Sequence, residues 1–405
     1  MLPYAIFILL ALLLAIFFDR QEEYVGTKKL WYRILCLYLI LLAGFRNGVG
    51  GDTQGYMEQF LYVPSNPAEY GSYIMDQLVY ASHMPGWTII TLLAKRWFDS
   101  FYAVQLIEAA IVNTCLFYFF RKNTTHIFLC ALLFGLTGQF FNMNTEVMRE
   151  GIAVGLCCVG MHQYLQGNKK WFYILAASSL FFHISAAVVF IFPFVRLKHI
   201  SIKTLVAALL ISFALWFGSD ILIEQLTHRL GGESGFVAKI MTYSDQASTI
   251  FGFLSSALKY LVVTAGALYF AQEGKEDDTD WQQRYVRYMS FYLLLAILGC
   301  GLSGFSRFLN YTVPFMLVMM AEFMGNYTRY LRYLAISKTV ILAGIFGLMG
   351  MFYMHYQPQT GRHYYDFFVP YTSVMDEHVD NTYREEMYLE ATAVRDANAK
   401  NSRNF

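Results

Sequence analysis

The sequence predicts an all-α, polytopic membrane protein, a transmembrane helical bundle of about twelve spans. Of its 405 residues, 57% are hydrophobic and only 15% are charged, which excludes an ordinary soluble domain. Apolar runs of roughly 16–22 residues recur along the chain, long enough to cross about 30 Å of hydrocarbon as helix. Many of its tyrosines and tryptophans flank these runs, where amphipathic rings favour the interface. A formal net charge of +1 gives no indication of nucleic-acid binding.

Eleven apolar runs are expected to be helical. The first has no basic segment before it and no small-residue cleavage site after it, so we interpret it as a span rather than a signal peptide. The cysteines all lie inside apolar runs and are expected to be core residues. The runs are 2–18, 31–45, 101–120, 126–141, 147–165, 172–195, 203–218, 250–271, 286–302, 307–324 and 336–355.

Lysine and arginine in the short loops predict the orientation, because such loops face the cytoplasm. If all basic loops lie inside, the stretch 85–98 must be a re-entrant or interfacial helix on the outer side. The run 172–195 must then enter and return as two half-spans that break near 182–185. Broken helices within a membrane are tolerated where they line a cavity. Both termini are expected outside. The basic loops are 19–33, 121–125, 166–171, 196–203, 272–287 and 325–338.

This topology places the unusual polar residues on the outer face. A transmembrane domain over 1–355 would carry an outer-face loop at 46–84, the re-entrant helix 85–98 and an outer-face amphipathic segment at 219–249. Residues 356–405 would follow as an outer-face cap over the site or a tail. The polar turns at 142–148, 183–185 and 303–307 reach the same face.

Four arginines lie next to water in this otherwise apolar chain: Arg46, Arg96, Arg149 and Arg307. A charge at the edge of a span must be hydrated, paired or engaged with an anion. Guanidinium binds phosphate through two parallel hydrogen bonds. Several arginines on one membrane face therefore indicate a site for phosphate-bearing lipid substrates.

The first arginine motif is rich in glycine. Arg46 is followed by Gly48, Gly50, Gly51 and Asp52, and the glycines allow tight turns that can bring Asp52 close to Arg46. The alternative is a solvated loop whose arginine extends to the interface.

The second motif begins a predicted helix at Arg149, with Glu146 and Glu150 within a turn. A structural ion pair between Glu146 and Arg149 is the alternative to a binding role. Both readings are compatible, since an orienting carboxylate also preorganises an arginine.

His183 lies at the predicted helix break, with Ser185 two residues on, and can accept a proton from a hydroxyl. A hydrogen-bonded core histidine is the alternative. Arg307 follows a Gly- and Ser-rich segment, whose small residues would let another helix or a ligand approach the backbone, and Tyr311 lies a turn below it. The alternative is that Arg307 is an interfacial anchor. Lys259, inside the run 250–271, either extends to an interface or faces a cavity.

No zinc-protease, Cys-x-x-Cys or phosphate-loop signature occurs in the sequence. The sequence therefore supports neither a zinc protease nor an ATP-driven motor.

Five short motifs resemble, in order and spacing, those of the EpsG family, bacterial polysaccharide polymerases akin to the Wzy O-antigen polymerases. The resemblance covers roughly residues 2–355. Two positions depart from the family: Glu150 stands where glutamine is usual, and His83-Met84 where a glutamate often precedes the Pro-Gly-aromatic motif. The motifs are Phe45-Arg46…Gly50-Gly51-Asp52-Thr53…Tyr56, Pro85-Gly86-Trp87, Asn144…Arg149-Glu150…Ala153, His183-Ile184-Ser185-Ala186 and Ser306-Arg307…Tyr311.

The resemblance implies a GT-C-like enzyme of the bacterial inner membrane that transfers glycans at its periplasmic or exterior face. The donor would be an oligosaccharide on undecaprenyl diphosphate and the acceptor a lipid-linked repeat unit, with no metal or nucleotide sugar. Partners would be membrane lipid, a chain-length regulator and a flippase.

Residue roles follow from this chemistry. Arginines would stabilise the departing diphosphate, and a base would accept the proton of the acceptor hydroxyl. The candidate bases are Asp52, His183 and Glu150. The candidate diphosphate- and glycan-binding residues are Arg46, Tyr56, Arg149, Arg307, Tyr311, Arg96 and Lys259.

The alternatives are an O-antigen ligase-like transferase using the same lipid carrier, a lipid-linked glycan transporter or flippase, and another membrane enzyme such as an acyltransferase. A transporter should spread its polar intramembrane residues across both halves of the bilayer. Here they gather at one face, which favours a transferase.

Overall fold

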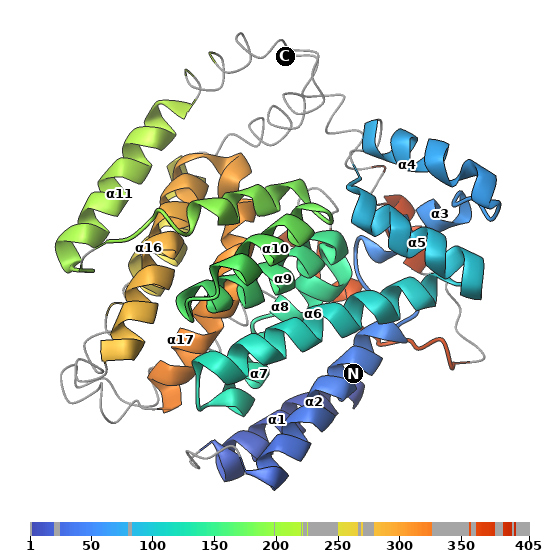
Figure 1. The fold of residues 1–405 in the computed structure, drawn as a ribbon, viewed down its shortest axis with the longest axis horizontal. Helices are drawn as coiled ribbons and strands as arrows, with labels where there is room; N and C mark the ends of the chain where they lie inside the picture. Colours follow the sequence, from blue (N-terminus) through green and yellow to red (C-terminus); the bar gives the residue numbers. More distant parts are fainter. Residues whose placement is uncertain are drawn as a thin grey trace. The chain divides into compact units, whose positions relative to one another are not determined.

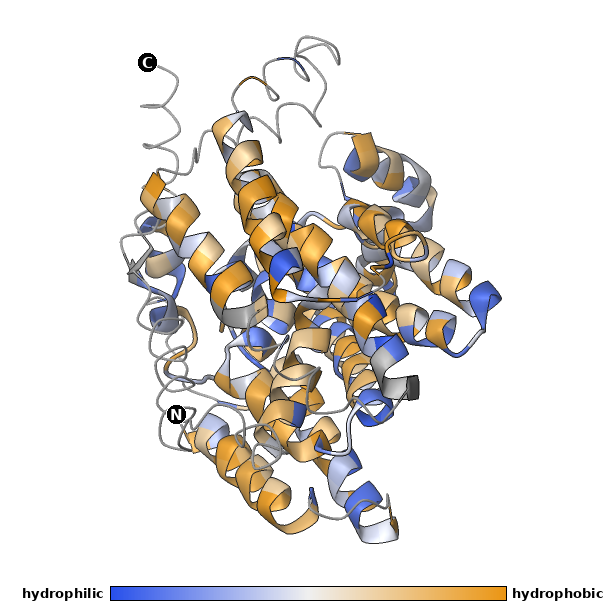
Figure 2. Cartoon of the chain, turned by 90° about the vertical axis from the view of Figure 1, so that its left-hand side faces the viewer, coloured by the Kyte–Doolittle hydropathy of each residue, from blue (hydrophilic) through white to orange (hydrophobic). Residues whose placement is uncertain are grey.

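The computed structural model describes residues 2–19, 25–79, 83–197, 199–219, 221, 225, 250–265, 269, 279–325, 356–357, 362–376, 384–390 and 393. Helices make up most of this structure (Figure 1), and hydrophobic residues predominate along most of them (Figure 2). The chain divides into two compact units. The first contains Met1–Gln163, Asn168–Ala186 and Ile336–Phe405, and the second contains Tyr164–Gly167 and Ala187–Ala335.

The first unit is built on long apolar helices. Helix α2 packs along α6, and α1 packs along α7. The α2–α6 approach is close, because a Cβ on Gly44 would lie 2.7 Å from Leu106 Cδ1. The helices are α1 (Leu2–Phe18), α2 (Gly26–Gly44), α6 (Phe101–Asn123), α7 (Ile127–Leu136) and α9 (Met148–Leu165).

The predicted run 126–141 is bent rather than straight. Helix α7 ends beside Gly138, whose φ of 73° is a left-handed conformation that glycine adopts readily. The chain then continues as α8 (Gln139–Phe141) and a π-helical turn, η2 (Asn142–Glu146), at 80° to α7. The segment expected to be a loop at 142–148 is therefore mostly helical.

Three helices occupy the segment between α2 and α6 and lie together (Figure 1). They are α3 (Thr53–Leu61), α4 (Tyr70–Val79), which follows a short 3-10 turn η1 (Pro67–Glu69), and α5 (Pro85–Phe98). The bounds of α5 match those expected from the sequence, because proline favours the first helical position.

The helix break expected near 182–185 is present. Helix α10 (Lys169–Leu180) ends in a turn, and a 3-10 helix, η3, begins at Ile184 and ends at Ile191.

The second unit packs α11 (Ile202–Phe217) and η5 (Ser303–Thr312) against α16 (Thr279–Gly301). Gly301 permits this approach, because a Cβ there would lie 2.6 Å from Leu215 Cβ, and one on Gly299 would lie 3.1 Å from Ser306 Cα. The glycines before Arg307 thus serve helix packing. The remaining elements are α14 (Ile250–Ala257), the π-helical η4 (Leu258–Thr264) and α17 (Val313–Gly325).

Within the described residues, the helices Phe101–Asn123 and Phe305–Gly325 are long and apolar enough to cross a membrane, and the bent pair Ile127–Leu136 with Gln139–Glu146 can be a third span. Shorter apolar helices lie at Leu2–Phe18, Ile202–Phe217 and Ile250–Val262. The helical membrane class is therefore confirmed. The run 336–355 and nearly all of 219–249 lie outside the described residues.

The C-terminal region contacts the loop after α2. Backbone hydrogen bonds join Asn47 N to Thr372 O at 2.9 Å and Val374 N to Phe45 O at 3.0 Å. Arg384 Nη1 donates to Gly48 O at 3.4 Å. A two-stranded antiparallel hairpin, β1 (Tyr356–Gln357) and β2 (Arg362–His363), and a 3-10 turn, η6 (Tyr364–Phe367), precede this contact.

Candidate functional site

The Arg46 motif and the Arg149 motif lie in direct contact, although the joined residues Gly51 and Glu146 are 95 positions apart. Gly51 N donates a hydrogen bond of 2.7 Å to Glu146 Oε1. Gly50 has a φ of 113°, and a Cβ there would lie 2.6 Å from Thr145 Cβ. Glycine is needed at position 50 because a larger residue would be both strained and blocked.

Arg46 is buried at the end of α2, only 1% exposed. Its guanidinium donates to Ala43 O at 2.5 Å and Val49 O at 3.2 Å, and its Nη2 lies 3.3 Å from Met148 Sδ. Burial lowers the pKa of Arg46, and the negative charge of Glu108 opposes that shift. These contacts make Arg46 a brace between the two motifs rather than an open anion site.

Glu108 on α6 is a residue that the sequence analysis missed. It is fully buried, and neither carboxylate oxygen has a hydrogen-bond partner within the described residues. Its neighbour Gln105 donates from Nε2 to Arg46 O at 3.0 Å. A carboxylate inside an apolar run is the signal that identifies such a position, since an acid in a span usually has a functional or pairing role.

Arg149 has a different environment, in the first turn of α9. It is half-buried, and its guanidinium carbon lies 5.8 Å from the centroid of the Tyr56 ring. Its Nε has no hydrogen-bond partner among the residues that the structure describes. The first turn of a helix favours anions through its exposed N–H groups and its dipole. Arg149 is therefore available to an anionic ligand.

The structure does not form the alternative Glu146–Arg149 ion pair among its described residues. Glu146 instead accepts hydrogen bonds from Gly51 N and from Thr145 Oγ1, the latter at 3.0 Å.

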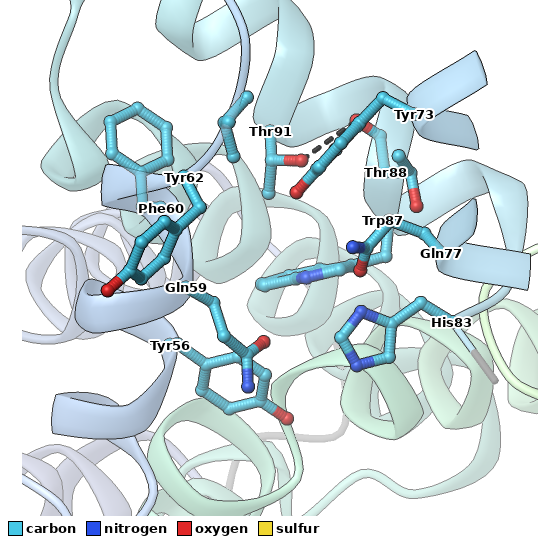
Figure 3. Close-up of a pocket in the computed structure, with 11 residues that line it drawn as sticks. Tyr56, Gln59, Phe60, Tyr62, Tyr73, Gln77, His83, Trp87, Thr88 and Thr91 are labelled. Atoms are coloured by element: carbon cyan, nitrogen blue, oxygen red, sulfur yellow. Dashed lines mark hydrogen bonds between the residues drawn. The ribbon is translucent and has the colours of Figure 1, made fainter. Parts of the chain in front are cut away.

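A cavity of about 150 Å³ opens beside Tyr56, between α3, α4 and α5 (Figure 3). Tyr56 and Trp87 pack against each other in its wall, with ring centroids 5.3 Å apart and ring planes tilted at 57°. Trp87 belongs to the Pro85-Gly86-Trp87 motif, but the sequence analysis gave it no role. The lining includes Tyr56, Gln59, Tyr73, Gln77, His83 and Trp87.

The fourth motif packs against the start of α5. Gly86 N donates to Phe181 O at 2.7 Å, and His183 Nδ1 lies 2.5 Å from Ser185 Oγ. The cavity helix α5 therefore contacts the segment that carries His183, which is half-buried.

The remaining candidates of the first unit have differing exposure. Asp52 is exposed at the start of α3, where its charge interacts with that of Glu146. Glu150 is buried, and Arg96 is exposed in the last turn of α5.

Three candidates lie in the second unit. Arg307 is exposed on η5, whereas Tyr311 is fully buried. Lys259 is exposed, with Nζ 4.9 Å from the centroid of Tyr260. That these residues share a site with Arg149 stays a prediction.

Within the described residues, no group of three or more His, Cys, Asp or Glu side chains is placed to hold a metal ion. The features assembled here are apolar membrane-length helices, an arginine at a helix start and an aromatic cavity beside it. They define a helical membrane protein with a candidate ligand site.

The EpsG family model matches residues 29–373, so the chain belongs to the EpsG family. The match includes all five motifs. No curated protein and no solved structure matches the chain. Family membership implies a polysaccharide polymerase-like function, of a glycosyltransferase type.

Proposed function

We propose that the protein polymerises undecaprenyl-diphosphate-linked oligosaccharide repeat units into an exopolysaccharide, capsule or O-antigen at the outer face of the bacterial inner membrane. In this proposal it is a GT-C-like enzyme of about twelve spans. The observation that carries it is the position of Arg149, at a helix start beside Tyr56 and an aromatic cavity. An anion-binding group next to a ring-binding space suits a sugar attached to a diphosphate.

The reaction joins an acceptor hydroxyl to the anomeric carbon of the donor while the bond from that carbon to the diphosphate oxygen breaks. The electron pair leaves with the diphosphate, and Arg149 stabilises its growing negative charge. The hydroxyl proton passes to a base, for which Asp52, His183 and Glu150 are the candidates. Arg307 is a further candidate for stabilising the diphosphate, as its sequence motif predicts.

The test is a polymer assay in cells that express the wild type, Arg149→Lys or Arg307→Lys at equal membrane levels. Arg121→Lys is the matched control, because Arg121 lies 5.8 Å from the ring of Tyr118, as Arg149 lies from that of Tyr56. The expected result is loss of long glycan and accumulation of single lipid-linked repeats on the outer leaflet.

Other outcomes would change the assignment. Accumulation on the inner leaflet would mean that the protein moves lipid-linked glycan across the membrane. Normal polymer that is no longer attached to its final acceptor would indicate a ligase. Unchanged polymer in both variants would contradict the arginine assignment.

A further inference from the structure

We propose that the cavity between α3, α4 and α5 binds a sugar ring of the glycan substrate. The identity of the glycan rests on the proposed function, but the chemistry of the cavity is argued from its own residues. Its volume of about 150 Å³ is well above that of a single water site and is sufficient for one six-membered ring.

The lining matches the two kinds of surface that a sugar ring presents. The C–H faces of a pyranose are apolar and pack on aromatic rings, and the rings of Tyr56 and Trp87 provide such a surface. The aromatic wall continues through Tyr73 on α4 (Figure 3). Trp87 is only 3% exposed, so its position is fixed by packing.

Hydroxyl groups at the edge of a sugar ring need hydrogen-bond donors and acceptors. Gln59 and Gln77 line the cavity from α3 and α4, and an amide side chain offers both. His83 adds a ring nitrogen. The hydroxyl of Thr88 is buried at the cavity and has no hydrogen-bond partner among the described residues. A buried polar group without a partner usually acquires one from a ligand or water.

The polar lining also argues against an acyl chain as the occupant. Two amides and an imidazole would lose their hydrogen bonds to water beside a hydrocarbon tail, and each such loss is unfavourable. A sugar replaces those hydrogen bonds.

Tyr56 connects the cavity to the anion site. The guanidinium of Arg149 lies 5.8 Å from the centroid of the Tyr56 ring. The same tyrosine lines the cavity. A ring bound against Tyr56 therefore lies next to the group that is available for phosphate. This is the placement required of the sugar closest to a diphosphate or to an accepting hydroxyl.

The experiment measures binding separately from polymerisation. Full-length protein in nanodiscs is titrated with oligosaccharides prepared by partial hydrolysis of the polysaccharide that the host cell makes, and binding is followed by tryptophan fluorescence and equilibrium dialysis. Removal of both amides, in Gln59→Ala/Gln77→Ala, should weaken binding at least about tenfold. Gln166→Ala is the matched control, because Gln166 is exposed and does not line the cavity.

A second probe identifies the chemistry that the cavity recognises. Undecaprenyl phosphate carries the lipid and the anion but no sugar, and its binding should be unchanged in the double variant and weakened in Arg149→Lys. The proposal is overturned if the double variant binds the oligosaccharides like the wild type, or if it loses the lipid phosphate instead.

The two proposals fail in different ways. If oligosaccharide binding depends on the amides but the arginine variants make normal polymer, the sugar site stands and the proposed function of Arg149 fails. If polymer depends on Arg149 but the amides affect neither binding nor polymer length, the function stands and the sugar site fails.

Discussion

Arg46 and Arg149 belong to two motifs that are in contact within the same unit, and the sequence presents both as phosphate-binding candidates. The structure gives them opposite environments. The guanidinium of Arg46 is buried and donates to the carbonyls of Ala43 and Val49. That of Arg149 is half-buried, beside Tyr56 and the cavity. An arginine whose donors are satisfied by backbone carbonyls stabilises the fold, whereas one with an unsatisfied donor is a candidate for binding a ligand.

This difference places Arg46 in a group of residues that supports the fold, here called the support, and Arg149 in a candidate binding surface beside the cavity. Glu146, Gly50 and Gly51 join Arg46 in holding the loop after α2 against η2. Tyr56 lies beside Arg149 and also lines the cavity. The comparison predicts that substitutions in the support lower stability, whereas substitution of Arg149 lowers the reaction rate.

The largest expected effect is that of Arg149→Ala on catalysis. Loss of a group that stabilises developing charge typically lowers the rate about 100- to 1000-fold. Polymer formation per molecule of purified protein should fall by this amount, with an unchanged unfolding temperature. Arg121→Ala should leave the rate unchanged. A large loss of stability in Arg149→Ala would instead place this arginine in the support.

Arg46→Lys should destabilise the protein by about 3 kcal/mol, because lysine cannot supply several directed donors and leaves a poorly paired buried charge. The expected observations are a lower unfolding temperature in detergent and reduced membrane abundance. Activity per folded molecule should remain close to that of the wild type. Normal stability together with lost activity would contradict the role of Arg46 as a brace.

Gly50→Ala should cost about 2 kcal/mol of stability, since its φ is left-handed and a Cβ would meet Thr145. Gly71→Ala on α4 is the control. Among the described residues, no atom beyond the helix's own backbone lies within 4 Å of a Cβ at position 71, so this change should be neutral or slightly stabilising. Thermal unfolding of both variants tests whether the loop requires its glycine.

The smallest effect concerns Asp19, which directly follows α1. Its carboxylate accepts hydrogen bonds from Phe128 N at 3.2 Å and Leu129 N at 2.7 Å, and burial raises its pKa to about 7. A carboxyl with a raised folded-state pKa stabilises the protein at low pH, and this stabilisation is lost as the pH rises through that value.

Relative to Asp19→Asn, the wild type should therefore lose about 1.4 kcal/mol of stability between about pH 6 and about pH 8. Unfolding by denaturant at both pH values measures this difference. Equal pH dependence of the two proteins would show that Asp19 does not titrate in this range.

The sequence by itself determined the class of the protein and many of its helices. Apolar runs and flanking signals predicted α1 and α5 with the bounds that the structure has, and they placed the break after α10, because hydropathy and the position of proline act locally. The order and spacing of five motifs indicated the EpsG family, and the family model confirms it.

The tertiary structure alone decided which polar groups are satisfied. The contact of Arg46 with Met148 joins residues 102 positions apart, and the contact of Gly51 with Glu146 joins residues 95 apart. The cavity likewise needs three helices, and Glu108 becomes a partner of Arg46 only when α6 packs against α2. Burial and hydrogen bonding depend on which distant segments meet, so the spacing of residues along the chain cannot distinguish a bracing arginine from a binding one.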